Sequence, residues 1–303
     1  MIKNLARNLA KSVVPLALSI AACSASAEDI DIYAANTTVE QSAPNVLIVL
    51  DNTANWSQSF SSGTKFAAEK VALAAVVSAL KTQFNLGMML YTETGSPNSN
   101  TDGGYMRFAI QPMSDGDGNP TNARNCLLTM VGATPTTPCT GSGITYYTNL
   151  DILNDKSNGG KAGKAMGETY DYFKGISAYA GSNKVKADPR AFVGGVTDGS
   201  APYQSPVATG TCAKNFIIVI SNGPFQDNTS DTSTAMSQLG TAGGDQTIIN
   251  PPDTTSNNNA GDEWTRFLNK AEGVDAVTYT LEVGPSTTGQ GPYNTALLQS
   301  MGR

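Results

Sequence analysis

Two unbroken apolar runs, each ending abruptly in polar residues, constrain the fold of this chain most strongly. The first is NVLIVLD, residues 45–51, and the second lies within KNFIIVISNG, residues 214–223. Continuous runs rich in Val and Ile are typical of strands covered on both faces, whereas half-exposed strands alternate polar and apolar residues. Both runs therefore predict buried strands, with Asp51 and Asn222 placed where their strands end.

Helical and strand patterns alternate along the rest of the chain, and apolar residues repeat at helical spacing from Leu73 to Phe84. We expect helices at 64–84, 161–179, 232–240, 261–271 and 293–303, and further strands at 86–94, 104–113 and 275–284. This order predicts an α/β fold, a doubly wound, mostly parallel sheet with helices on both faces. Functional residues of such sheets lie at the carboxyl edge, where Asp51 and Asn222 are expected to meet.

The first residues form an export signal. Three basic residues precede the short apolar stretch SVVPLALSIAAC, and ASA at 25–27 suits signal peptidase, so residues 1–27 are predicted to be a signal peptide. The alternative is a lipobox, IAAC, in which Cys23 becomes a lipidated N-terminus. In both cases the protein leaves the cytoplasm for the periplasm or the cell surface. Residues 28–44 are predicted to be a mobile linker, and no later segment suits a membrane span.

Composition excludes several classes of function. The net charge is −6, and it falls to −9 without residues 1–27, which hold three basic residues and no acid. Nucleic-acid binding is therefore not expected, because a phosphate backbone requires a basic surface. The sequence contains no histidine. His general bases, Ser–His or Cys–His nucleophile pairs and most zinc sites are thus absent, and we expect a protein that is not an enzyme.

The cysteines suggest one disulfide. After export, Cys126, Cys139 and Cys212 remain, and we expect Cys126 and Cys139 to pair in an oxidising compartment. This bridge would lie in an insertion rich in Gly, Asn and Thr at about 114–150. Cys212 is then an odd thiol just before a strand. Burial as an inert side chain and pairing with either of the other two cysteines both remain open.

The run D-x-T-x-N at 51–55, followed by a helix and by a later strand ending in SNG, resembles a von Willebrand factor A domain. Further stretches, among them GYMRFAIQPM, GETYDYFKG, DEWTRFL and VTYTLEVGP, resemble in order the N-terminal domain of the type IV pilus tip-associated adhesin (PilY) family. The resemblance covers roughly 44–302 and implies one such domain at 45–303. Family members are usually longer and carry a β-propeller. Here LLQSMGR comes before the domain's usual last strand, which we expect to be missing.

The resemblance implies a metal-ion-dependent adhesion site in a changed form. Asp51 and Thr53 match the first loop, Asn55 replaces a Ser, and Asn222 stands where an Asp is usual. The Thr of the second loop is missing, since position 160 is Gly and the nearest hydroxyl is Ser157. Two outcomes stay open: a site for Mg²⁺ or another divalent cation, and a vestigial site stabilised by hydrogen bonds. The absence of a carboxylate at position 222 favours the vestigial site, because it removes several kcal/mol of electrostatic attraction for the cation.

Three other motifs have ordinary structural interpretations. SDGDGNP places Asp115, Asp117 and Asn119 like the start of a calcium loop, but the Gly and Glu that an EF-hand needs later are absent, which favours a polar turn. GGKAGK at 159–164 lacks the spacing of a phosphate loop. The aromatic cluster at 170–173 is expected to belong to the core rather than to a carbohydrate platform.

These observations predict an exported, non-enzymatic binding module of a type IV pilus-associated adhesin or assembly protein. It would act through protein–protein contacts at the carboxyl edge of the sheet. Expected partners are minor pilins, other pilus components or a host-surface protein. The alternative is a purely structural pilus-assembly module with no metal and no adhesion. A secreted hydrolase with paired carboxylates is a third reading, and the sequence places no such pair.

Overall fold

A computed structural model describes most of the chain beyond residue 41, and residues 42–303 form one compact unit. The described ranges are 42–80, 84–91, 101–141, 146–157, 161–207, 213–222, 227–249, 260–270, 272–284 and 292–302. The predicted signal peptide, Cys23, Gly160 and Cys212 lie outside these ranges, as do most of the predicted linker and of the loop between the second and third predicted strands. No described helix is long and apolar enough to cross a membrane.

The centre of the molecule is a five-stranded sheet with the order β5-β4-β1-β6-β7. The strands are β1 (Asn45–Leu50), β4 (Asn85–Tyr91), β5 (Gly104–Pro112), β6 (Asn215–Ser221) and β7 (Ala276–Glu282). Four strands are parallel, and only β5, at one edge, is antiparallel to its neighbour. The two apolar runs became the central pair β1 and β6, in register from Asn45 opposite Asn215 to Leu50 opposite Ile220.

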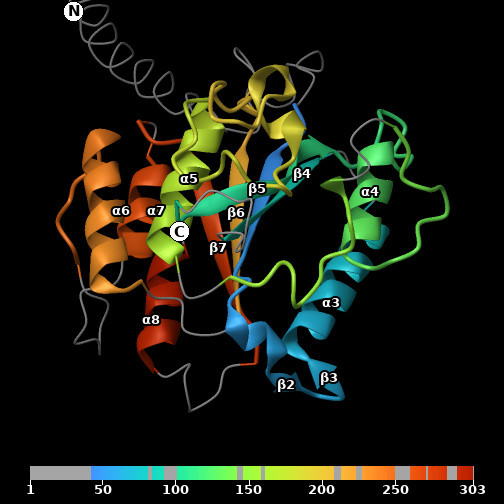
Figure 1. The fold of residues 1–303 in the computed structure, drawn as a ribbon, viewed down its shortest axis with the longest axis horizontal. Helices are drawn as coiled ribbons and strands as arrows, with labels where there is room; N and C mark the ends of the chain where they lie inside the picture. The colour runs from blue at the N-terminus through green and yellow to red at the C-terminus, as the bar shows by residue number, and fades with distance from the viewer. Residues whose placement is uncertain are drawn as a thin grey trace, which may run out of the picture. The chain divides into compact units, whose positions relative to one another are not determined.

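Helices cover both faces of this sheet (Figure 1). One face carries α3 (Lys65–Ala79) and α4 (Asn122–Met130), and the other carries α5 (Ala162–Lys174), α6 (Thr229–Thr241), α7 (Ala260–Leu268) and α8 (Pro292–Met301). Short elements complete the fold: the 3₁₀ turns η1 (Ala54–Ser57), η3 (Pro189–Ala191) and η4 (Val193–Gly195), and the hairpin β2 (Ser59–Phe60) with β3 (Gly63–Thr64). The prediction of an α/β fold with a mostly parallel sheet between helices is confirmed. β7 is the last strand among the described residues.

Helix boundaries depart from the predicted ones for local reasons. The helix expected at 161–179 ends at Lys174, because Gly175 adopts φ 66°, the left-handed conformation that closes a helix. α6 begins three residues earlier than expected, where the Asn228 side chain accepts a hydrogen bond from the Asp231 backbone N–H. The helix α4 was not predicted at all. Its first turn is held by Thr121, whose hydroxyl accepts from the Arg124 N–H at 3.2 Å.

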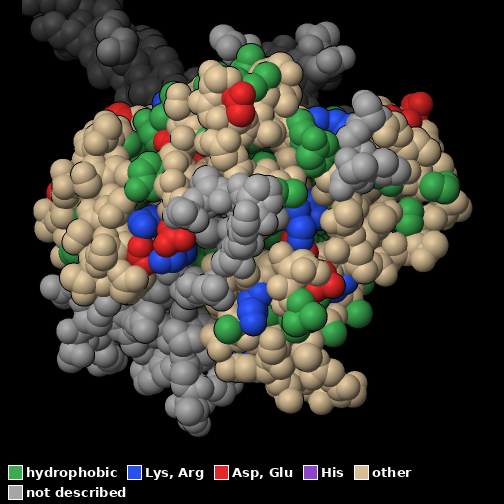
Figure 2. Space-filling view, in the orientation of Figure 1, with side chains coloured by type: hydrophobic (Ala, Val, Ile, Leu, Met, Phe, Trp, Pro, Cys, Tyr) green, Lys and Arg blue, Asp and Glu red, His purple; other side chains and the backbone are tan. Residues whose placement is uncertain are grey.

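The core lies on both sides of the sheet. Tyr172 and Phe173 are each 1% exposed, and Tyr170 is buried against Trp264 and Phe267 of α7. The prediction that these aromatics belong to the core is confirmed. On the face shown in Figure 2, described charged side chains lie in small groups of both signs rather than in one basic area.

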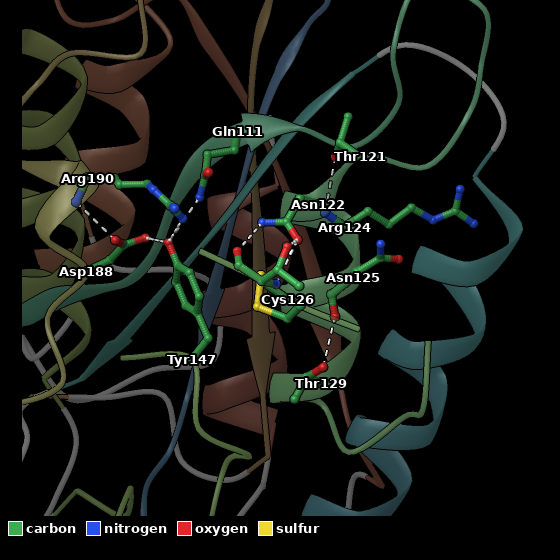
Figure 3. The surroundings of a disulfide bond; sticks show 12 residues. Gln111, Thr121, Asn122, Arg124, Asn125, Cys126, Thr129, Tyr147, Asp188 and Arg190 are labelled. Carbon is green, nitrogen blue, oxygen red and sulfur yellow. Dashed lines mark hydrogen bonds between the residues drawn. A yellow bond between two sulfur atoms is a disulfide. The ribbon is translucent and has the colours of Figure 1, made fainter. Parts of the chain in front are cut away.

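A disulfide ties α4 to the loop that follows it. Cys126 and Cys139 are bonded, with Cα atoms 4.6 Å apart. Beside the bridge, the Asn122 side chain donates to the Thr140 carbonyl at 2.7 Å and accepts from the Thr140 N–H at 2.9 Å (Figure 3). A loop of this length contributes about 3 kcal/mol by restricting the unfolded chain. The disulfide and the bonds of Asn122 therefore hold residues 139 and 140 against α4.

Candidate functional site

The carboxyl ends of β1 and β6 form a buried polar cluster. The two strands are hydrogen-bonded neighbours, and the Asp51 N–H continues their ladder by donating to the Ile220 carbonyl at 2.9 Å. Asp51 and Asn222 are both 0% exposed, and Thr53 is 6% exposed. The structure thus brings together three of the four residues that the sequence singled out.

Asp51 is held by hydrogen bonds on both carboxylate oxygens. Oδ1 accepts from the Thr53 N–H at 3.0 Å, and Oδ2 accepts from the Ser221 hydroxyl at 3.2 Å. Burial nevertheless raises the pKa of Asp51, because removal from water penalises the charged form more than these hydrogen bonds stabilise it. The ionised Asp51 carboxylate therefore depends on neighbouring groups to offset the cost of its burial.

Asn222 connects the two strand ends. Its side-chain amide donates to the Asp51 carbonyl, and its Oδ1 accepts from the Thr53 hydroxyl at 3.4 Å. The Asn222 backbone carbonyl accepts from the Lys65 ammonium at 2.8 Å. An Asn at this position can both donate and accept, which an ionised Asp cannot. The Asn222 side chain thus forms its hydrogen bonds with Asp51 and Thr53, within the protein.

Lys65 and Glu69, on the first turns of α3, are members of the cluster that sequence reasoning missed. Lys65 is 3% exposed and Glu69 is 5% exposed. Burial lowers the pKa of Lys65, while the negative charges of Glu69, Glu282 and Asp51 act in the opposite direction. A cation on the first turn of a helix is unfavourable to the helix dipole, so these carboxylates and the Asn222 carbonyl offset both costs.

Glu69 holds a proton more tightly than an ordinary carboxyl. Burial and the charge of Asp51 raise the pKa of Glu69 to about 8. Hydrogen bonds from Trp56 and Asn222 and the positive charge of Lys65 lower this pKa, but by less. The Trp56 indole N–H donates to Glu69 Oε2 at 2.7 Å, and Trp56 is itself 0% exposed. The turn η1 is therefore anchored to α3 through this one buried bond.

These residues do not fit a divalent ion. Mg²⁺ requires several oxygen ligands that are free to face it. Here the Asp51 carboxylate and the Thr53 hydroxyl are bonded within the cluster, and the Lys65 ammonium already brings a positive charge beside them. Among the described residues, no three acidic or cysteine side chains are grouped so that they could hold an ion.

Asn55 does not join the predicted ligand set. The turn η1 directs Trp56 into the core and leaves Asn55 half-exposed, with its Oδ1 accepting from the Gln58 amide at 2.8 Å. Ser157 is buried near the cluster, where its backbone N–H donates to the Asn52 carbonyl at 2.8 Å. The second loop thus reaches the site through Asn52, the residue between Asp51 and Thr53.

Asn52 links the site to a second buried network. Its Oδ1 accepts from the Tyr91 N–H at the end of β4, and its amide donates to the Asp155 carbonyl. The Asp155 carboxylate pairs with Lys186 at 2.9 Å and lies 3.8 Å from the Arg107 guanidinium. These bonds tie the segment at 151–157 to the carboxyl edge and make the site rigid.

The remaining motifs behave as ordinary turns. The Asn119 side-chain amide donates to Asp115 Oδ2 at 3.1 Å, and Asp115 Oδ1 accepts from the Asn119 and Asp117 backbone N–H groups at 2.8 and 3.0 Å. These bonds, the side-chain one first, lower the pKa of Asp115. The polar turn predicted there is confirmed. Of GGKAGK, the residues at 159 and 160 lie outside the described ranges. Lys161 and Lys164 both pair with Asp231, at 2.7 and 2.6 Å.

No protein-family model matches the chain, and no curated protein matches it.

Proposed function

We propose that this protein is an exported, non-enzymatic binding module of a type IV pilus-associated adhesin or assembly protein, built on a von Willebrand factor A-like domain. The observation that carries the proposal is the meeting of Asp51, Thr53 and Asn222 at the carboxyl ends of β1 and β6. In open α/β sheets, ligands bind at this edge. The mostly parallel sheet of order β5-β4-β1-β6-β7 supports the α/β part of the proposal.

The contact surface in this proposal is the exposed part of η1 and of the β2–β3 hairpin, residues 54–64, which we call the rim of the buried cluster. The segment that follows Asp51 presents exposed polar side chains from η1 and the β2–β3 hairpin, and Phe60 is 37% exposed at the hairpin. Partly exposed aromatic side chains are frequent anchors of protein–protein interfaces. Minor pilins and other pilus components are the proposed partners, with a host-surface protein as a second class.

The proposed contact does not use a metal ion. Lys65 supplies positive charge to a cluster whose acids are Asp51, Glu69 and Glu282. The Lys65 ammonium thus offsets part of the negative charge that a cation would otherwise meet there, and recognition is left to the rim. Catalysis is not proposed, because the chain has no histidine, and Asp51 and one oxygen of Glu69 are held in structural hydrogen bonds.

A purely structural role in pilus assembly is the competing function. The extensive bonding of the cluster favours it to some degree, because a site closed by its own side chains can serve only to hold two strand ends together. The two functions differ in whether the rim binds a partner of its own.

The test is a pull-down of minor pilins with the exported chain and with two exposed-residue variants. Phe60→Ala removes the rim aromatic, and Val185→Ala removes a side chain that is 51% exposed and lies outside the rim segment. We expect Phe60→Ala to reduce pilin capture by about tenfold, the size of a modest hot spot, and Val185→Ala to leave it unchanged. Equal capture by both variants would remove the rim from the proposed function.

A further inference from the structure

A second site lies between α5 and α6, away from the strand ends described above. It is a cavity of about 470 Å³, lined by Tyr170 and Asp171 of α5, Ser237 and Gln238 of α6, and Trp264 of α7, with a further wall from the loop at 176–179. The volume is sufficient for a side chain of a partner molecule.

Its polar groups include two acceptors without donors. The Asp171 carboxyl has no hydrogen bond or ion pair with any described residue, and Gln238 Oε1 is buried without a partner. Asp171 is half-buried, whereas Gln238 Oε1 is a buried acceptor of the kind that is normally satisfied, so leaving it without a donor costs free energy. Their presence together in one cavity points to a ligand that donates several hydrogen bonds.

The other walls are aromatic. Tyr170 and Trp264 have ring centroids 5.7 Å apart, and Tyr179 is 41% exposed at the rim of the cavity. Aromatic faces attract cations through the ring quadrupole, and arginine is the cation that most often stacks on them. The Lys174 ammonium lies 5.9 Å from the Tyr170 centroid, but Lys174 does not line the cavity.

Gly167 keeps the inner end of the cavity open. A Cβ at this position would lie 3.1 Å from the Trp264 ring and 3.5 Å from Gln238 Oε1. Glycine is unfavourable in the middle of a helix, by roughly 0.5–1 kcal/mol relative to alanine. Its presence here leaves room for the Trp264 ring and the Gln238 side chain to lie close to α5 at the inner end of the cavity.

We propose that this cavity binds an arginine side chain of a protein partner. A guanidinium is planar and carries five N–H donors, so one group can bond the Asp171 carboxylate and Gln238 Oε1 while it stacks on an aromatic ring. A neutral sugar would leave the Asp171 charge uncompensated. A lysine ammonium would supply the charge without the flat face. The proposal does not depend on the pilus function.

The charge of Asp171 makes binding depend on pH. Burial, and then the charge of Glu168 one turn earlier on α5, raises the pKa of Asp171. Glu168 is itself held by the Tyr203 hydroxyl at 2.6 Å. The residues that line the cavity from α6, α7 and the 176–179 loop carry no charge. The other titratable groups of the lining are the hydroxyls of Tyr170 on α5 and of Tyr179 in the loop. An arginine should therefore bind better at high pH, with release of a proton.

The experiment is a calorimetric titration of the exported chain with N-acetyl-arginine amide and with its neutral isostere, N-acetyl-citrulline amide. We expect a Kd on the order of 1 mM for the arginine probe, and binding at least about tenfold weaker for citrulline. The arginine affinity should rise between about pH 6 and pH 9. N-acetyl-lysine amide and a methyl glycoside complete the set, and both should bind more weakly than arginine.

Two variants separate binding from folding. Asp171→Asn removes the charge without changing the shape; it should lower the arginine affinity at least about tenfold and abolish the pH dependence. Its thermal stability should be equal to or higher than that of the wild type, because a half-buried carboxylate without a partner among the described residues is lost. Glu272→Gln, at an exposed acid, is the matched control and should change neither property. The assignment would be overturned if the arginine probe does not bind, or if citrulline, lysine or the glycoside binds as tightly as arginine. It would also be overturned if Asp171→Asn leaves the arginine affinity and its pH dependence unchanged.

Discussion

Replacing Lys65 with methionine tests the electrostatic reasoning about the carboxyl edge. The change keeps the length of the apolar stem and removes the ammonium that donates to the Asn222 carbonyl at 2.8 Å. What remains is the buried pair Asp51 and Glu69, with the half-buried Glu282 nearby, without the cation. Breaking a buried pair from one side is costly because the other charge loses its compensation.

The cost should depend on pH through Glu69. At about pH 6 this carboxyl holds its proton, since its pKa is raised to about 8, and the loss is essentially one charge-assisted hydrogen bond, roughly 1.5–3 kcal/mol. At about pH 9 Glu69 is ionised in the folded protein, and the loss should approach the roughly 3–5 kcal/mol typical of an uncompensated buried charge. The variant should therefore lose more stability at the higher pH.

Urea unfolding of the wild type and of Lys65→Met at both pH values measures the two losses. Lys270→Met, at an exposed lysine just after α7, is the matched control and should stay within about 0.5 kcal/mol of the wild type. A Lys65→Met loss that is the same at both pH values, or no larger than that of the control, would refute the idea that Lys65 neutralises the cluster.

Three further changes probe the same structure. The pKa of Glu69 is raised in the folded state, so the stability that Glu69 contributes is present below its usual pKa and is lost as pH rises toward about 8. Glu69→Gln should flatten this loss of stability with pH. In urea unfolding, the variant should gain on the order of 1–3 kcal/mol over the wild type at the highest pH. Cys126→Ser should cost about 2–5 kcal/mol, and reducing agent should lower the Tm of the wild type but not of the variant. Gly181→Ala would place a Cβ 1.8 Å from the Tyr203 hydroxyl, so it should displace the bond to Glu168 and cost roughly 1–3 kcal/mol by calorimetry; an unchanged Tm would show that the loop yields freely.

The order of strands and helices was largely predictable from the sequence, because it depends on local patterns of apolar and polar residues. The runs that end at Asp51 and Asn222 contain the information for two buried parallel strands, and parallel register then forces their ends together. The helix α4 escaped prediction because its sequence, NARNCLLTM, is short and begins within a segment rich in turn residues. Its stability comes from packing on α3 and from the disulfide, which are long-range contacts.

The chemistry of the site was less predictable. Nothing in the local sequence marks Lys65 at the start of α3, and only its contact with Asn222, 157 positions away, reveals it as part of the site. Asn55 fitted a motif spacing, yet the 3₁₀ turn directs Trp56 inward in its place. Motif spacing fixes which residues are near a strand end, whereas the conformation of the next few residues decides which side chains face the cluster.

The most direct measurement is the affinity of the exported chain for minor pilins in EDTA and in excess Mg²⁺. If the rim recognises the partner and Lys65 neutralises the strand ends, binding is detectable and its Kd is the same in both buffers. Binding that disappears in EDTA and is lost in Asp51→Ala would contradict this account, and so would the absence of binding in both.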